Sequence, residues 1–288
     1  MPRTSLPQEV SAEIKAGNVL AGDDFDETQL RRWYEQEKEA YFLDDATSGR
    51  QDPWYAYMRY VNDRLVFPRV AARSGSILFL GTGDGVEAET FHQAHPDWNL
   101  LFVEASDSFK TELALRFPRA RVVEPHPSGD LAVESESQDV ICAFSVLHHI
   151  ANVSHVLGEL YRLTTPGGWL FIREPCSSMG DWRGSRSATP NERGISRHLL
   201  TRMAAEAGFV TAAPPRPVVF GPLNKVLKRT IGFRFVPMPV LYLVDRALSS
   251  AVALNDQYWR DAWYKKVGPS SYLYSFRRPT PSTPHGAP

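Results

Sequence analysis

A glycine-rich loop and a following acid are the residues best suited to bind a ligand. The loop, Gly81–Gly85 with the sequence GTGDG, comes directly after the apolar run 77–80, and Glu104 ends the next apolar run. Glycines let the backbone turn tightly and let a ligand approach it closely. The spacing differs from the Gly-x-Gly-x-x-Gly that seats a pyrophosphate, and a carboxylate at Glu104 suits ribose hydroxyls. Together they favour a nucleoside-containing ligand without a diphosphate; alone, the loop could be a plain turn and Glu104 a solvated acid.

Two adjacent histidines and a glutamate are the candidates for proton transfer. His148 and His149 follow the apolar run 140–144, and Glu174 follows the run 169–172. Histidine is the side chain most often used as a general base, and a carboxylate can orient a hydroxyl or accept its proton. Adjacent residues project differently, so we expect one histidine to face a pocket, and we favour His149. The alternatives are histidines that cap or pack a helix, and a Glu174 carboxylate bound to nearby backbone donors.

A long polar segment, 176–194, follows Glu174 and could bind a substrate. Connections of this length at the edge of a sheet are often functional. The guanidinium groups of Arg183 and Arg186 suit a carboxylate, a phosphate or a polyhydroxylated molecule, and Trp182 offers a face for stacking. The alternative is a solvated surface loop.

Alternating strands and helices, predicted from residue 76 onwards, would bring these candidates to one edge. Continuous apolar runs are typical of strands buried on both faces of a sheet. Amphipathic helical segments lie between them, and this alternation predicts a parallel, doubly wound sheet. The carboxyl ends of parallel strands meet at the edge where such folds bind ligands. The predicted strands are 77–80, 100–103, 120–123, 140–144 and 169–172.

The flanking segments predict helices and short strands. Residues 1–22 lack periodicity and are expected to form a loose tail. A helix is predicted to begin at Asp26, with Gln29 as its capping-box partner, and another should end before Gly208. The remaining predictions are a helix over 54–72, a helix over 196–207, a short strand at 218–220, broken helices over 222–266, a strand over 271–276 and a disordered end at 279–288.

The composition excludes several classes of protein. Of 288 residues, 43% are hydrophobic, and 33 acids against 32 bases give a net charge of −1, which argues against wholesale nucleic-acid binding. Cys142 and Cys176 cannot form a disulfide framework, and we expect no metal site because the histidines and cysteines lack ligand spacing. The N-terminus does not resemble a signal peptide, and Asp245 and Arg246 interrupt the most apolar stretch, so a membrane span is not expected. We expect a cytoplasmic enzyme or binding domain.

A cluster of cations precedes that apolar stretch. Lys225, Lys228, Arg229 and Arg234 alternate with apolar residues. This pattern permits a helix that lies at a membrane interface, and the alternative is a solvated amphipathic face.

Four motifs in order resemble the class I S-adenosylmethionine (SAM)-dependent methyltransferases. They are ILFLGTGDG at 77–85, LFVEAS at 101–106, QDVICAFSVLHHI at 138–150 and LYRLTTPGG at 160–168. The third is similar to the fourth-strand motif of small-molecule members, including the quinone-biosynthesis enzymes. The letters MGDWR and NERG of the polar segment also resemble some methyltransferases of bacterial glycan and secondary-metabolite pathways. The match covers about 100 residues, 76–175, and loosely extends to 209.

The resemblance implies SAM as the cofactor and suggests its contacts. Glu104 would accept both ribose hydroxyls, Ala105 would lie against the adenine, and Phe144 and Ser145 would sit beside the sulfonium. Phe79 stands where the family usually has an acid at the end of the first strand. The cofactor's amino group must therefore be bound by other residues, and Asp84 could partly replace the missing acid. Gly81, Gly83 and Gly85 would wrap the methionine portion, and Thr82 and Asp84 of the same loop are further candidates to bind the cofactor.

Three further positions are candidates for the site. Asp130 is the nearest polar candidate for the acid after the third strand, although the usual position counts back to Pro127 or His126. Most aromatics of residues 33–60 are expected to pack against the core. Tyr60 is the candidate to cover the cofactor, and Tyr57 is the candidate to contact the substrate.

The implied fold is α/β, with a Rossmann-like, doubly wound, mostly parallel seven-stranded sheet, N-terminal helices and a C-terminal helical insertion. We divide the chain into a tail and helical cap (1–74), a SAM-binding core (75–220), an insertion or lid with the last strand (221–278) and a disordered tail (279–288). Substrate choice is expected in the parts outside the core. A homodimer is compatible with the sequence.

The predicted activity is in-line methyl transfer to a hydroxyl of a small polar metabolite, such as a sugar or a natural-product intermediate. An oxygen acceptor needs a base, for which His149, His148 and Glu174 are the candidates. Nitrogen and carbon acceptors stay open. The first alternative is a SAM-binding enzyme that catalyses a cyclisation or rearrangement without methylation, with the sulfonium as an electrostatic aid. The second is a non-catalytic partner subunit.

Overall fold

A seven-stranded mixed sheet forms the centre of the protein. The computed structural model describes residues 4–44, 53–184, 189–221, 223 and 236–281. The strand order is β3-β2-β1-β4-β5-β7-β6, and β7 runs antiparallel to both of its neighbours while the other pairs are parallel. The predicted fold class is confirmed. The strands are β1 (Ser76–Leu80), β2 (Asn99–Val103), β3 (Arg121–Val123), β4 (Gln138–Phe144), β5 (Thr164–Pro175), β6 (Val210–Val218) and β7 (Ser271–Arg277).

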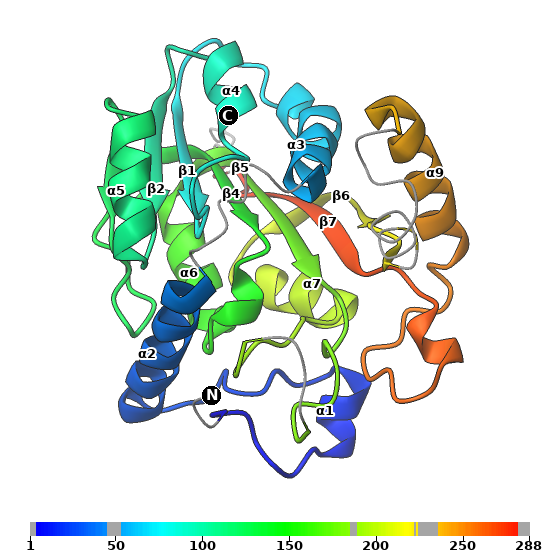
Figure 1. Cartoon of the computed structure of the whole chain (residues 1–288). Helices are drawn as coiled ribbons and strands as arrows, with labels where there is room; N and C mark the ends of the chain where they lie inside the picture. Colours follow the sequence, from blue (N-terminus) through cyan, green and yellow to red (C-terminus); the bar gives the residue numbers. More distant parts are fainter. Residues whose placement is uncertain (1–3, 45–52, 185–188, 222, 224–235, 282–288) are drawn as a thin grey trace, which may run out of the picture.

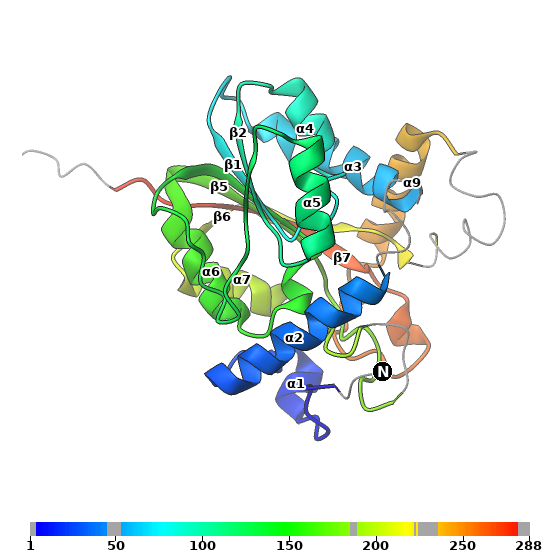
Figure 2. The same ribbon diagram turned by 60° about the vertical axis from the view of Figure 1, so that its left-hand side comes forward.

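Helices cover both faces of the sheet because the side chains of each strand alternate between two cores. Leu78 and Leu80 of β1 pack with α6 and α7, whereas Ile77 and Phe79 pack with α3 and α4 on the other face. Figures 1 and 2 show these layers. The helices are α1 (Ala12–Ala16), α2 (Glu27–Asp44), α3 (Pro53–Leu65), α4 (Glu89–Ala94), α5 (Asp107–Arg116), α6 (Val153–Leu163), α7 (Arg197–Glu206) and α9 (Met238–Ala251).

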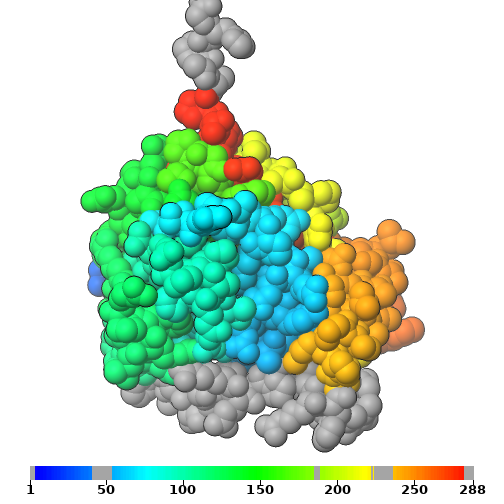
Figure 3. All heavy atoms as spheres, turned by 90° about the horizontal axis from the view of Figure 1, so that it is seen from above, coloured from blue at the N-terminus to red at the C-terminus, as the bar shows by residue number. Residues whose placement is uncertain are grey.

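Three helices outside the predicted core, α2, α3 and α9, lie at or near the site. α2 lies across the carboxyl ends of the strands, below the sheet in Figure 1. α3 lies beside α9, and α9 lies on the side of the molecule away from α5, as Figure 3 shows from above. None of the helices in the described part of the chain has the length and apolarity that a transmembrane span requires.

Local signals predicted several element ends correctly. Asp26 and Gln29 form the expected capping box before α2, with backbone N–H to side-chain oxygen distances of 3.0 and 2.9 Å. Ser196 caps α7 and Gly208 follows it with φ of 107°. The helix after the glycine loop, α4, begins only at Glu89, because turn residues occupy 86–88.

The prediction of a loose tail at residues 1–22 is wrong for the described part, residues 4–22. This segment contains α1, and Leu6, Val10 and Ala21 are buried in a small core, defined here as the tryptophan core, together with Trp33 and others. The apolar residues of the segment are single anchors that recur at no helical or strand period, so periodicity could not reveal them.

Other differences between the predicted and observed elements occur at prolines and at the edge strand of the sheet. The helix predicted over 54–72 ends at Leu65, and a short 3-10 turn with Pro68 follows, since proline cannot continue the backbone hydrogen bonding. β6 is longer than the predicted 218–220 despite its prolines, because an edge strand tolerates them. β5 and β7 likewise extend beyond their predicted ranges.

Of the helices predicted over 222–266, the described residues contain α9 and short turns. Residues 222 and 224–235 lie outside the described part of the chain, as do 45–52 and 282–288.

Candidate active site

A cavity of about 960 Å³ opens at the carboxyl ends of β1, β2, β4 and β5. This is the switch point of the sheet, where the chain order reverses between β1 and β4 and where doubly wound folds bind ligands. The charged side chains of its wall include two cations, Lys38 and Arg173, and a larger number of acids. The excess of negative charge suits a positively charged ligand. The acids are Glu37, Asp84, Glu87 and Glu104.

The glycine loop forms one wall of the cavity. Gly81, Thr82, Gly83 and Asp84 line it, whereas Gly85, the last residue of the loop, does not. Gly81 has φ of 58°, and a Cβ atom there would lie 2.1 Å from Cγ2 of Val146. A side chain at this position would therefore be strained and would displace the segment after β4.

Glu104 is held rigidly at the end of β2. Its Oε2 accepts the backbone N–H of Gly83 at 2.9 Å, and its Oε1 accepts those of Ala105 and Ser106 at 2.9 and 3.0 Å. The carboxylate is thereby fixed to the loop while it lines the cavity with Ala105. A carboxylate has about four acceptor positions, so it can also accept hydroxyl groups of a ligand.

Phe144 and Ser145 line the cavity at the end of β4. Ser145 adopts a left-handed backbone, with φ of 56°, which is uncommon for a residue other than glycine. Strained residues of this kind concentrate at functional sites because surrounding contacts must hold them. Here the Ser145 N–H donates to the carbonyl of Arg173 at 2.6 Å.

A buried ion pair lies in the same cavity wall as Phe79, the residue that stands where the family usually has an acid. Phe79 lines the cavity and stacks on Phe102, with ring centroids 5.8 Å apart. Nearby, Arg173 Nη2 donates to Glu87 Oε1 at 2.7 Å, and its Nη1 donates to Asn62 at 2.9 Å. Sequence analysis missed both charged residues. The available signal was an arginine at the end of an otherwise apolar strand.

His149 faces the cavity, as favoured from the sequence, and a carboxylate orients it. Its Nδ1 lies 2.9 Å from Oε2 of Glu37, a residue of α2. Burial and the neighbouring His148 lower the pKa of His149. Glu37 also accepts hydrogen bonds from the Thr189 hydroxyl at 3.0 Å and the Asn191 N–H at 3.1 Å. Glu37 was not predicted, although an acid on the apolar face of its helix was a visible signal.

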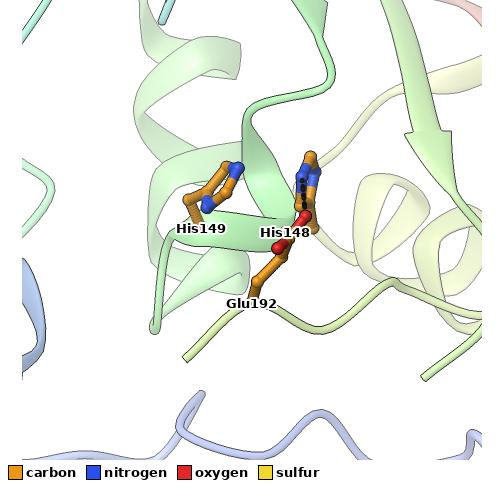
Figure 4. Close-up of side chains that lie close together, drawn as sticks. All are labelled: His148, His149 and Glu192. Atoms are coloured by element: carbon orange, nitrogen blue, oxygen red, sulfur yellow. Dashed lines mark ion pairs between the residues drawn. The ribbon is translucent and has the colours of Figure 1, made fainter. Parts of the chain in front are cut away.

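His148 points away from the cavity and joins two acids. Its Nδ1 lies 2.6 Å from Glu174, and its Nε2 lies 3.4 Å from Glu192. Burial opposes protonation, but these carboxylates outweigh it and raise the pKa of His148 to about 9. Figure 4 shows His148, His149 and Glu192 together. Their ligand atoms lie within 4.8 Å of one another and could hold a metal ion, but we interpret the cluster as an ion-paired crosslink because both nitrogens of His148 face carboxylates.

Glu174 does not line the cavity, in contrast to its predicted placement. The residue is fully buried, and its Oε1 accepts the backbone N–H groups of Val146 and Leu147, each at 2.7 Å. This is the alternative that the sequence left open. Glu174 therefore shapes the segment that carries both histidines.

The structure does not bring the predicted substrate residues to the cavity. Trp182 is buried in the tryptophan core, where its indole N–H donates to the carbonyl of Pro7 at 2.9 Å. Arg183 pairs with Asp181 on the surface at 2.6 Å. Arg186 lies outside the described residues. Among the described residues of the polar segment, Trp182 therefore anchors the N-terminal residues instead of lining the cavity.

Three other predicted residues also lie outside the cavity wall. Tyr57 donates to Asp245 at 2.6 Å in the contact between α3 and α9, and Tyr60 packs against Tyr242 there. Asp130 is exposed and pairs with His155 at 2.9 Å. The wall instead contains His126 and Pro127 after β3, and a larger group from α2 and α3. That group is Leu30, Trp33, Tyr34, Trp54, Tyr55 and Met58.

A protein-family model described as a methyltransferase domain matches residues 51–213, more than half of the chain. The chain belongs to this family. The predicted membership of the class I SAM-dependent methyltransferases is therefore confirmed, and SAM is the methyl donor of this family. The matched segment contains the glycine loop, Glu104 and both histidines.

Curated relatives agree with this assignment. The chain is 25% identical over 161 residues to a protein of Mycobacterium tuberculosis named "Probable S-adenosylmethionine-dependent methyltransferase", covering 56% of this chain and 57% of the relative. It is also 25% identical over 226 residues to a highly reducing polyketide synthase of Pyrenophora dematioidea, covering 73% of this chain and 8% of the synthase. The methyltransferase thus spans only part of the length of these relatives.

Solved structures share the fold at low identity. The [4+2]-cyclase SpnF aligns with a TM-score of 0.53 at 19% identity, covering 82% of this chain and 85% of the cyclase. The phosphoethanolamine N-methyltransferase 2 of Haemonchus contortus, in complex with SAM, aligns with a TM-score of 0.52 at 15% identity, covering 77% of this chain and 53% of that one. These likenesses support the fold alone.

Proposed function

We propose that this methyltransferase methylates a hydroxyl oxygen of a small acceptor, with His149 as the general base. The observation that carries the proposal is the 2.9 Å contact between His149 Nδ1 and Glu37 in the cavity wall. A carboxylate at Nδ1 favours the tautomer with its proton there, which leaves the lone pair on Nε2. Because its pKa is lowered, the ring is neutral at pH 7 and able to accept a proton.

The cofactor half of the cavity would be built from the loop and Glu104. When bound, SAM supplies an electrophilic methyl group on a positively charged sulfur. Glu104 would accept the ribose hydroxyls and Ala105 would contact the adenine. Gly81, Thr82 and Gly83 would let the backbone approach the methionine portion, and Phe144 and Ser145 would lie beside the methyl group; all seven residues line the cavity.

The Glu87–Arg173 pair fits the amino acid end of the cofactor. That end carries an ammonium and a carboxylate, and the pair offers a buried carboxylate and guanidinium 2.7 Å apart. Paired opposite charges can exchange partners without leaving either one unsatisfied. This pair, together with Asp84, would take over the role of the acid that the family usually has at the position of Phe79.

The acceptor half favours a hydroxyl on an apolar or aromatic scaffold. Trp54, Tyr55 and Met58 line the cavity from α3, and Trp33 lines it from α2. Flat aromatic faces bind rings by stacking and exclude water. In-line transfer depends on alignment and on exclusion of water, so these side chains would contribute to rate as well as to selectivity. This revises the small polar acceptor predicted from the sequence.

A non-methylating cyclisation is the second candidate function. Phe79 in place of the usual acid and the fold similarity to the cyclase SpnF favour it. Mass spectrometry of products from a panel of aromatic alcohols, incubated with SAM and the pure protein, separates the two. Our proposal expects a mass gain of one methyl group and an equal amount of S-adenosylhomocysteine. A new chromatographic peak with the mass of the substrate, and no S-adenosylhomocysteine, would support cyclisation instead.

A further inference from the structure

The end of the polar segment, residues 189–193, contacts the proposed base and its partners without lining the cavity. Its sequence is TPNER, and none of its five residues belongs to the cavity wall. Asn191 and Arg193 are fully buried. Burial of polar and charged side chains costs free energy unless they are hydrogen bonded. The partners of these side chains therefore indicate what the segment does.

Two donors from this segment fix the Glu37 carboxylate. The Thr189 hydroxyl donates to Oε2 at 3.0 Å, and the Asn191 N–H donates to Oε1 at 3.1 Å. Oε2 is also the atom that lies 2.9 Å from His149 Nδ1. With a donor at each oxygen, the carboxylate cannot rotate without losing hydrogen bonds. The orientation of the His149 imidazole therefore depends on residues beyond Glu37.

The Asn191 side chain ties this arrangement to two other parts of the chain. Its Nδ2 donates at 2.9 Å to Oε1 of Gln36, the neighbour of Glu37 on α2. Its Oδ1 accepts the Ser5 N–H at 2.7 Å and the Thr4 hydroxyl at 3.2 Å. The backbone N–H that contacts Glu37 is thereby held in place by both α2 and the N-terminal residues.

Arg193 and Trp33 hold the turn that carries the base. The Arg193 guanidinium donates to the carbonyls of His148 and Ala151, at 3.0 and 2.9 Å. It lies 4.8 Å from the centre of the Trp33 ring, and the Trp33 indole N–H donates to the His149 carbonyl at 2.7 Å. The segment therefore helps to fix both the backbone and the side chain of His149.

We infer that Thr189 and Asn191 are positioning residues for the methyl transfer proposed above. By holding Glu37, they keep the Nδ1 proton of His149 directed at a carboxylate, and Nε2 stays available to accept the proton of the acceptor hydroxyl. The effect on turnover rests on the proposed function. The effect on the imidazole does not, since it can be measured without acceptor or cofactor.

Substitutions at Thr189 separate its hydroxyl from its bulk. Thr189→Val keeps the shape and loses the donor, and Thr189→Ser keeps the donor. Thr201→Val is the matched control, because the Thr201 hydroxyl donates to a carbonyl within α7 at 2.8 Å.

Nitrogen-15 NMR of the full chain with labelled histidine measures the tautomer at neutral pH. The signals of His149 are assigned by their loss in His149→Ala. In the wild type, we expect one protonated and one unprotonated ring nitrogen with well-separated signals. In Thr189→Val the two signals should move toward each other, because exchange between tautomers averages them. Thr189→Ser and Thr201→Val should keep the wild-type positions.

Turnover and cofactor binding provide the second measurement. We expect kcat of Thr189→Val to be about three- to fivefold lower, with S-adenosylhomocysteine bound within about twofold of the wild type and kcat restored in Thr189→Ser. Asn191→Ala should shift the nitrogen signals in the same direction. Thr189→Val decides the question alone if Asn191→Ala does not fold.

Two NMR results would overturn the inference. One is unchanged His149 signals in Thr189→Val, whatever its kcat. The other is an equal shift in Thr189→Val and Thr189→Ser, since packing and not the hydroxyl would then be responsible. Signals that move as expected in a protein that forms no methylated product would support the positioning of the imidazole and contradict the proposed function.

Discussion

The two halves of the cavity are built in different ways. The cofactor half uses backbone and side chains from consecutive strand ends, with Glu104 bonded to the loop only 21 positions before it. The acceptor half joins residues that are far apart, since Glu37 meets His149 across 112 positions. A local motif thus suffices for the first half, whereas the second depends on docking of α2 and the segment after β5. Variation of those flanking parts can change the acceptor while the cofactor half is kept.

Substitution in the loop should cause the largest effect on stability. Gly81→Ala places a Cβ atom 2.1 Å from Val146 at a φ of 58°, so we expect the free energy of unfolding to fall by about 2–4 kcal/mol. Gly158→Ala is the control, because no atom lies within 4 Å of the added Cβ and the site is in α6. It should raise stability by about 0.5–1 kcal/mol. Urea unfolding of both variants measures this, and equal losses would contradict the steric argument.

Removal of the proposed base should reduce turnover strongly and leave cofactor binding nearly unchanged. We expect His149→Ala to lower kcat by about 10²–10⁴-fold, since it removes proton transfer to the imidazole. His155→Ala is the matched control, because His155 is an exposed histidine on α6. Steady-state kinetics with the acceptor found by mass spectrometry provides the measurement. Full turnover in His149→Ala would eliminate the base and leave alignment as the source of rate.

The crosslink behind the base should respond to pH. The pKa of His148 is about 9 in the folded protein against an ordinary 6.5, so the stability that its proton contributes is complete below pH 6.5 and is lost as the pH rises through 9. His148→Gln should therefore cost most near pH 6, on the order of a few kcal/mol, and least near pH 10. Urea unfolding of both proteins across this range tests the sign. A difference that grows with pH would contradict the ion-paired state.

The orienting acid should have the smallest effect. Glu37→Gln keeps the size of the side chain but removes the charge that favours protonated His149, so the pKa of His149 should fall further. We expect kcat to drop by about tenfold and the acidic limb of its pH profile to move to lower pH. An unchanged limb would mean that another group titrates.

The sequence predicted local features well and features built from distant residues poorly, which is the same difference as between the two halves of the cavity. The strand runs, the capping box at Asp26 and the stop at Gly208 are local patterns, and the structure contains them. Glu104 was predicted to bind a ligand because a strand-end acid follows a glycine loop, and the structure places it in the cavity wall. For these features, the chemistry and the spacing lie within about 25 neighbouring residues.

The remaining features depended on tertiary contacts that no local pattern contains. Glu174 ends a strand at the right edge, yet the turn after β4 folds its N–H groups onto the carboxylate. Trp182 could stack on a ligand, but docking of Pro7 buries it. On α3, helical rotation turns Trp54 and Met58 to the cavity and Tyr57 to α9. Which face meets which neighbour is decided only by the assembled fold.

Calorimetry with S-adenosylhomocysteine tests the division of the cavity most directly. The full chain, Glu104→Gln and His149→Ala are titrated under the same conditions. Glutamine at 104 would present an amide donor to backbone donors and lose the charge that accepts ribose hydroxyls, so we predict at least about tenfold weaker binding for Glu104→Gln. His149→Ala should bind within about twofold of the wild type. No binding by the wild type, or equal losses in both variants, would contradict the account.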